Sequence, residues 1–192
     1  VGRGDLVKCV LDKLDTSFDM YEIDPNIKLL NNIDKSKIIY GDFLNFNIDK
    51  LYDTIIGNPP YVRTKKGNLY IDFIEKCYKL LNENGELIFI VPSDFIKLTS
   101  STKIINIMMD NGTFTHIFHP NNEKLFKNAS IDIIFFRYCK NKKLSNKIYY
   151  NNTEKYLINT NGILTFSDDD KNQNYKTFDE YFDIYVGMVS GK

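Results

Sequence analysis

The stretch that most constrains this chain is residues 52–62, which read Tyr-Asp-Thr-Ile-Ile-Gly-Asn-Pro-Pro-Tyr-Val. The apolar run at 54–56 predicts a buried strand, and Gly57 lets the backbone turn as it leaves the sheet. Two prolines follow, and each restricts its own φ and biases the preceding residue toward extended conformations. The Asn-Pro-Pro-Tyr motif, residues 58–61, is therefore expected to stand stiffly at the carboxyl end of a strand, where open α/β sheets bind ligands.

The groups of this motif suit a flat ring that carries an exocyclic amino group. Asn58 and the carbonyl of Pro59 offer two acceptors, Pro60 stiffens the turn, and Tyr61 offers a ring face for stacking. Drawing both N–H bonds of the amine toward the acceptors concentrates the lone pair on nitrogen and aims it at an electrophile. The alternative interpretation is a proline-stiffened turn that joins a strand to a helix.

Composition limits the class of protein. A chain of 192 residues with 43% hydrophobic content can bury one core with a small appendage. Its formal net charge is zero, so a surface for nucleic acid is expected to be local or to lie outside this chain. The three cysteines share no metal-like spacing and predict reduced thiols. His116 and His119 have no partners at metal spacing, and no apolar run is long enough to span a membrane, so we expect neither a metal nor a membrane.

Strands and helices are predicted to alternate over the first 140 residues. The expected strands are 18–23, 37–40, 54–56, 87–91, 114–118 and 131–138. One expected helix begins near Leu6 and another begins at Asp24-Pro25. Two more cover 70–81 and 104–109, and Asn84-Gly85 is expected to stop the helix that covers 70–81. This alternation predicts an α/β fold with a doubly wound, mostly parallel, Rossmann-like sheet.

The character of the chain changes after residue 140. Short β-like runs follow at 147–150, 155–158 and 163–166, so we expect a small β-rich extension. The predicted division is therefore a first domain at 1–140 and a connector with the start of a further region at 141–192.

Three weak signals occur in order along the chain: the first looks like the loop after a strand that is absent here, and the other two stand at the end of the expected strand 18–23 and after the expected strand 37–40. Gly2 and Gly4 would let the backbone approach a ligand closely at a sheet crevice. Glu22 lies 18 residues after Gly4, about where an acid binds ribose hydroxyls, although an acid at a strand end is often only a helix cap. Asp42 is placed to accept from an adenine amino group with Phe43 packing on the ring, although Asp in a Gly-Asp turn is as often structural.

A family resemblance rests on these motifs together. Gly-x-Gly, Tyr-Glu-Ile-Asp at 21–24, Gly-Asp-Phe-Leu at 41–44 and Asn-Pro-Pro-Tyr-Val at 58–62 resemble the S-adenosylmethionine-dependent DNA N6-adenine methyltransferases of restriction–modification systems, with the TaqI and Eco57I types nearest. Residues 80–93 and 125–138 also resemble that group. The resemblance covers about residues 1–140, and the Asn-Pro-Pro-Tyr motif is its most specific part.

The resemblance implies a site for S-adenosylmethionine and a site for a flipped adenine. The residues implied for the cofactor are Gly2, Gly4, Glu22, Ile23, Asp42 and Phe43. The residues implied for catalysis on the target amino group are Asn58, Pro59, Pro60 and Tyr61. Tyr61 and Phe126 would stack on the flipped base, although Phe126 also suits a simpler role as a hydrophobe that anchors a loop.

The implied function is a site-specific, adenine-specific DNA methyltransferase in the cytoplasm of a bacterial or virus-infected cell. Its partner would be double-stranded DNA, bound mainly through a recognition domain outside this chain. Residues 181–192 resemble the entry to that domain, and the acidic residue and proline that precede the first glycine in the family are not here. We therefore expect a fragment that lacks the first strand. The alternatives are a methyltransferase for protein glutamine N5 or ribosomal RNA guanine N2, and a non-catalytic remnant or subunit.

Overall fold

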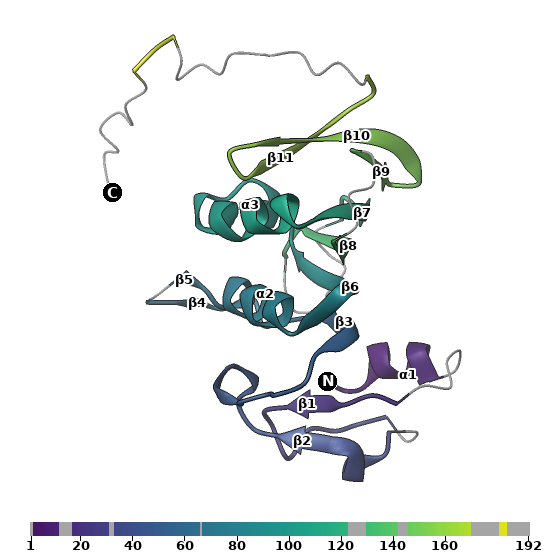
Figure 1. The fold of residues 1–192 in the computed structure, drawn as a ribbon. Helices are drawn as coiled ribbons and strands as arrows, with labels where there is room; N and C mark the ends of the chain where they lie inside the picture. The colour runs from purple at the N-terminus through teal and green to yellow at the C-terminus, as the bar shows by residue number, and fades with distance from the viewer. Residues whose placement is uncertain are drawn as a thin grey trace.

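The structure is a computed structural model that describes residues 2–11, 17–30, 33–65, 67–122, 130–141, 146–169 and 181–183 (Figure 1). The helices are α1 (Asp5–Leu11), α2 (Leu69–Lys79) and α3 (Thr102–Asp110). Short 3-10 turns cover Lys35–Lys37, Phe43–Asn45, Ser93–Ile96 and Thr99–Ser101.

The strands form a large sheet, a small sheet and a short hairpin. The large sheet has the order β11-β10-β9-β7-β8-β6-β3, made of β3 (Tyr52–Gly57), β6 (Leu81–Pro92), β7 (Gly112–Phe118), β8 (Ile133–Lys140), β9 (Lys147–Tyr150), β10 (Thr153–Thr160) and β11 (Ile163–Ser167). The small sheet pairs β1 (Met20–Glu22) with β2 (Ile38–Tyr40) in parallel. The hairpin joins β4 (Arg63–Thr64) to β5 (Gly67–Asn68) and projects beyond α2 (Figure 1).

Strand direction in the large sheet is mostly uniform. β3 pairs with β6 in parallel, and β8 is inserted antiparallel between β6 and β7, so β3, β6 and β7 run the same way. β9 pairs with β7 in parallel, and β10 reverses before β11 returns to the common direction. The predicted α/β class, with a mostly parallel sheet and a β-rich C-terminal part, is confirmed. Strands β9 to β11 extend the same sheet past residue 140, so the sheet itself does not mark a domain boundary there. The predicted division at residue 140 stays a prediction.

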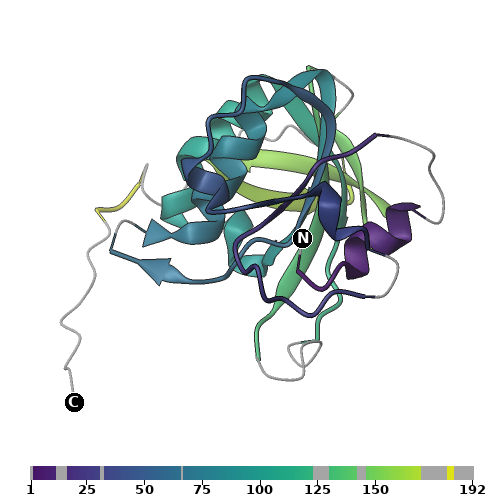
Figure 2. The ribbon, with the colours of Figure 1, turned by 90° about the horizontal axis from the view of Figure 1, so that it is seen from below.

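The core lies between the large sheet and two helices. In both views α2 and α3 cover the same side of that sheet (Figure 1 and Figure 2). Helix α2 buries Tyr70, Ile74 and Cys77, whose spacing of four and three residues puts them on one face. Alternate residues of β8 face this layer, since the Tyr138 hydroxyl donates to the Met108 carbonyl of α3 at 2.8 Å and Phe136 stacks on Phe95 of the Ser93–Ile96 turn with ring centroids 5.6 Å apart.

Two boundaries predicted from the sequence are wrong. Residues 24–30 form a turn followed by chain without regular secondary structure, not a helix. The Asp24 carboxylate accepts the Asn26 amide at 2.9 Å, and the Leu30 amide donates to the Arg3 carbonyl at 2.9 Å. These bonds offer the backbone partners that a helix would have supplied.

The second error concerns the end of α2. The helix ends at Lys79, and the pair expected to terminate it, Asn84 and Gly85, lies inside β6. Tyr52 of β3 pairs with Leu81 of β6, and Thr54 pairs with Glu86. Strand β6 therefore has more residues than β3 between these two pairs, and it bulges there. A Cβ on Gly85 would lie 3.1 Å from the Tyr52 carbonyl oxygen, so glycine permits the close approach of the two strands.

No helix in the described part of the chain is long and apolar enough to cross a bilayer. Within the same residues there is no group of three or more His, Cys, Asp or Glu side chains arranged to hold a metal ion.

The aromatic centre of the core gives a test of the fold. Phe136 is 2% exposed and also contacts Phe114 edge-on at 5.4 Å. We expect Phe136→Ala to lower the free energy of unfolding by about 3–5 kcal/mol, because it removes a ring and leaves a cavity. Phe118→Ala, on the neighbouring strand at 48% exposure, should cost far less. Urea unfolding followed by circular dichroism measures both, and equal losses would contradict this core.

Candidate functional site

The Asn-Pro-Pro-Tyr motif follows directly from the carboxyl end of β3. Gly57 lies opposite Phe89 of β6, and a Cβ on this glycine would meet the Phe89 ring at 2.9 Å, so the position favours glycine. Pro59 is buried, whereas Asn58 is exposed at the sheet edge. The turn is therefore anchored by a proline while its amide side chain remains accessible.

The Tyr61 side chain closes this turn onto the sheet. Its hydroxyl donates to Oδ1 of Asn58 at 2.6 Å and lies 3.1 Å from the carbonyl oxygen of Ile90 in β6. Burial raises the pKa of Tyr61 above its usual value, so the phenol keeps its proton and remains a donor. The Asn58 amide oxygen, which is expected to accept the target amino group, is thus held in place by Tyr61, whose ring is expected to stack on the target base.

Tyr70 packs behind Tyr61. The two rings meet edge-to-face with centroids 6.4 Å apart, and Tyr70 is 3% exposed. Burial, and then the nearby charge of Asp94, raises the pKa of Tyr70 to about 12. Its hydroxyl is buried and has no hydrogen-bond partner among the described residues, which leaves a hydrogen-bonding group beside the motif.

The glycine loop and the end of β1 form a second polar centre. Glu22 is 9% exposed, and its carboxylate accepts the amides of Gly2 at 2.7 Å, Ile23 at 2.9 Å and Asp24 at 3.1 Å. Burial acts to raise the pKa of Glu22, but the amide donors of Asp24 and Gly2 are among the groups that outweigh it, and the pKa is lowered. Gly4 has φ +94°, and a Cβ there would meet the Ile33 side chain at 2.6 Å, so this position requires glycine.

The loop after β2 lies beside this centre, because the Gly41 amide donates to the Glu22 carbonyl at 2.8 Å. Asp42 caps the turn Phe43–Asn45 by accepting the Leu44 amide at 3.0 Å, and it remains exposed. Phe43 is half-buried and packs between Tyr21, 5.3 Å away edge-on, and Phe73, stacked at 5.5 Å. Lys76 of α2 also reaches this loop, where its ammonium donates to the Phe43 carbonyl.

The structure brings some of the predicted residues together. Gly2, Gly4, Glu22, Ile23, Asp42 and Phe43 gather around the ends of β1 and β2, and residues 58–61 gather at the end of β3. Phe126 lies outside the described residues. The sequence analysis did not identify Tyr70 or Lys76 as site residues. Each contacts the site from α2 through the tertiary fold, and the spacing of residues along the chain does not reveal such contacts.

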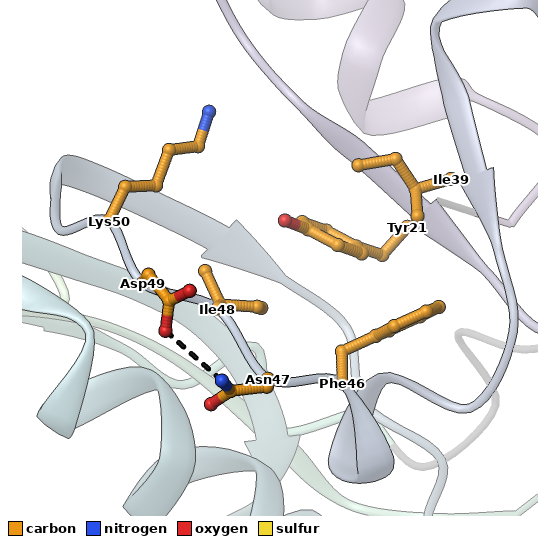
Figure 3. Close-up of a pocket in the computed structure, with 7 residues that line it drawn as sticks. All are labelled: Tyr21, Ile39, Phe46, Asn47, Ile48, Asp49 and Lys50. Atoms are coloured by element: carbon orange, nitrogen blue, oxygen red, sulfur yellow. Dashed lines mark hydrogen bonds between the residues drawn. The ribbon is translucent and has the colours of Figure 1, made fainter.

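One shallow pocket, of about 240 Å³, lies away from the Asn-Pro-Pro-Tyr motif but beside the turn after β2, to which its lining residue Phe46 belongs. It is lined by Tyr21, Ile39, Phe46, Asn47, Ile48, Asp49 and Lys50 (Figure 3). Residues 46–50 precede β3, whereas the motif follows that strand, so the pocket lies at the opposite end of β3 from Asn58. The Asn-Pro-Pro-Tyr motif is therefore not part of this hollow, which adjoins the groups around β1 and β2 instead.

Comparisons with known proteins agree on a methyltransferase fold. The family model described as Eco57I restriction-modification methylase matches residues 11–126. The chain is 30% identical over 185 residues to the type II methyltransferase M.HincII of Haemophilus influenzae, covering 84% of this chain and 36% of that protein. It thus spans about a third of the length of such curated relatives.

Solved structures share the fold at low identity. A putative class I S-adenosylmethionine-dependent methyltransferase from Listeria monocytogenes aligns with a TM-score of 0.51 at 17% identity, over 61% of this chain and 42% of that one. The M protein of the type I restriction enzyme EcoKI aligns with a TM-score of 0.54 at 15% identity, over 69% and 34%.

The Tyr61 hydroxyl gives a test of this geometry. We expect Tyr61→Phe to lower the free energy of unfolding by about 1 kcal/mol at neutral pH, because the Asn58 oxygen loses its donor. Since the folded-state pKa is raised, this contribution should be constant below about pH 10 and fade as the phenol ionises at higher pH. Tyr149→Phe, at 52% exposure, is the matched control. Denaturant unfolding across this pH range measures the difference, and equal behaviour of the two variants would refute the hydrogen bond.

Proposed function

This chain belongs to the Eco57I restriction-modification methylase family, and we propose on that basis that it carries out methyl transfer to the N6 amino group of adenine in DNA. The observation that carries the proposal is the arrangement at the end of β3. There Asn58 presents an exposed amide, the Pro59 carbonyl lies next to it in the chain, and the Tyr61 ring stands beside both.

The mechanism follows from these groups. In the free protein Oδ1 of Asn58 accepts a hydrogen bond from the Tyr61 hydroxyl, and this oxygen is therefore already oriented as an acceptor. A flipped adenine would bring its own N–H to this oxygen and its second N–H to the Pro59 carbonyl. The nitrogen lone pair is then directed away from both acceptors and toward the methyl donor. The chain contributes alignment and removal of water, and the proton leaves the product amine for solvent after transfer.

S-adenosylmethionine is the proposed cofactor, and the residues around β1 and β2 fit its adenosine half. Ile23 is 68% exposed, an apolar surface suited to packing on an adenine ring. Asp42 is exposed, and a carboxylate has room for a further donor beside the amides that it already caps. The space around Gly2 is open, since a Cβ there would meet nothing within 4 Å. When bound, the cofactor supplies a sulfonium methyl group that is already a strong electrophile.

Double-stranded DNA is the proposed partner, and the protein would then act in the cytoplasm. Arg63 and Lys65 are exposed on the hairpin that follows the motif, where they are suited to binding phosphates near a flipped base. The chain has no net charge and spans about a third of its relatives' length. We therefore assign most of the sequence recognition to a domain outside residues 1–192.

The deciding experiment is methylation of genomic DNA by the whole protein with labelled cofactor, followed by nucleoside analysis. N6-methyladenine supports the proposal, whereas N4-methylcytosine would retain the reaction class and overturn the target base. Label found only in protein glutamine or in ribosomal RNA would move the substrate to another amino group. No transfer to any of these would indicate a non-catalytic subunit.

Asn58 gives the sharpest mutational test. We expect Asn58→Ala to reduce single-turnover methylation by about 10²–10³, because one preorganised polar contact to the reacting group is lost. The affinity for the cofactor should stay within twofold, since the amide lies at a different strand end. Asn47→Ala removes an exposed asparagine before the same strand and should leave the rate unchanged. A variant at position 58 with undiminished rate would remove this residue from the mechanism.

Asp42 has a matched control within the chain. Asp34 caps the turn Lys35–Lys37 just as Asp42 caps its own, with φ −74° and −73° respectively, and each accepts the amide two residues ahead. Both alanine variants should lose similar stability. Asp42→Ala alone should weaken cofactor binding, by roughly 5- to 150-fold, the equivalent of about 1–3 kcal/mol for a lost polar contact. Calorimetry measures both, and equal cofactor affinity in the two variants would contradict this role.

A further inference from the structure

Lys76 makes an unusual set of contacts from the last turn of α2. Its ammonium nitrogen lies 2.5 Å from the carbonyl oxygen of Phe43, 3.1 Å from that of Leu44 and 2.6 Å from that of Phe46. A lysine ammonium has three donors, so these carbonyls satisfy all of them. The side chain is half-buried, which distinguishes it from the exposed Lys79 one turn further along the helix.

The three carbonyls belong to one turn, the loop that follows β2. This turn is also held at its other end, where Asp42 accepts the Leu44 amide and the Asn45 side-chain amide. The carboxylate thus binds the donors of the turn while the lysine binds its acceptors. Hydrogen bonds to charged groups are stronger than those between neutral groups, so the two side chains fix the turn from both sides.

Lys76 also holds the aromatic ring of this turn. Its ammonium lies 4.9 Å from the centroid of the Phe43 ring, within the range of a cation–π contact. The same ring stacks on Phe73, which precedes the lysine by three residues on α2. Helix α2 therefore binds both the backbone and the ring of the loop.

We propose that Lys76 is a positioning residue that sets the geometry of the 42–46 turn for binding the adenosine of the cofactor. The inference rests on the proposed function, because that function assigns Asp42 of this turn to the cofactor. Lys76 itself reaches neither the methyl group nor the target base. It acts through the turn, so its loss changes affinity for the cofactor and not the chemical step.

The experiment compares three variants of the whole protein. Lys76→Met keeps the aliphatic stem and removes every donor, Lys76→Arg keeps the charge and donors, and Lys79→Met removes a lysine from the exposed side of the same helix. Amide hydrogen exchange of Asn45 and Phe46, whose amides bond to the carbonyls of Asp42 and Phe43, measures the order of the turn directly. Calorimetry measures cofactor affinity, and methylation at saturating cofactor measures the chemical step.

The expected result is specific to Lys76. Lys76→Met should speed exchange in the turn and weaken cofactor binding by about tenfold, while the rate at saturating cofactor stays within about twofold of wild type. Lys76→Arg should restore most of the affinity, and Lys79→Met should resemble wild type. Circular dichroism checks that each variant folds. If Lys76→Met does not fold, Lys76→Gln, which keeps an amide donor, replaces it.

The outcomes separate the two proposals. Unchanged cofactor affinity in a folded Lys76→Met or Lys76→Gln protein overturns the positioning role and leaves the proposed function standing. An unaltered affinity combined with a lower rate at saturating cofactor also overturns it, because the residue would then act on the chemical step. Failure of the wild-type protein to bind the cofactor defeats the proposed function, and the positioning role with it.

Discussion

The parallel pairing of β3 with β6 is the constraint on which the candidate site depends. It sets Gly57 opposite Phe89, and it brings the Tyr61 hydroxyl to the Ile90 carbonyl one residue further along β6. Leu87, Phe89 and Val91 are at most 2% exposed, so the register of β6 is fixed by the core. A slip of one residue would move these side chains to the other face of the sheet, and the motif would lose its contacts.

Much of the fold was predictable from the sequence, because local patterns agree with the tertiary structure. The apolar run at 54–56 indicated the strand β3, and the spacing of Tyr70, Ile74 and Cys77 indicated α2. The predicted burial of β3 was wrong, because it lies at the edge of the sheet and Ile56 is 40% exposed. The errors arose where a distant partner decides the conformation. Asn84-Gly85 reads as a helix terminator but falls in the bulge of β6, between its two pairings with β3, where Asn84 has the left-handed backbone of a turn with φ +64°. The triple contact of Lys76 joins segments 30 residues apart, and no local pattern encodes it.

The two acids of the proposed cofactor site differ in a way that their sequence positions conceal. Glu22 is buried, and backbone amides from the glycine loop and from its own turn surround its carboxylate. Asp42 is exposed and caps a single turn. Both follow short strands, but the first has most of its acceptor capacity engaged within the protein. Glu22 therefore shapes the glycine loop, and Asp42 is the acid with more capacity for an additional donor.

The relation between the two halves of the site matters more than either half alone. Methyl transfer requires the donor and the acceptor in line, and a displacement of about 1 Å can cost about a hundredfold in rate. The proposed cofactor residues lie on the small sheet, whereas Asn58 lies on the large one. Contacts across the two include the 2.9 Å bond between the hydroxyls of Tyr21 and Tyr52, and the binding of the 42–46 turn by α2. Since α2 begins just after the hairpin that follows the motif, one helix links the proposed base-binding turn to the proposed cofactor loop, and its rigidity would become part of the alignment.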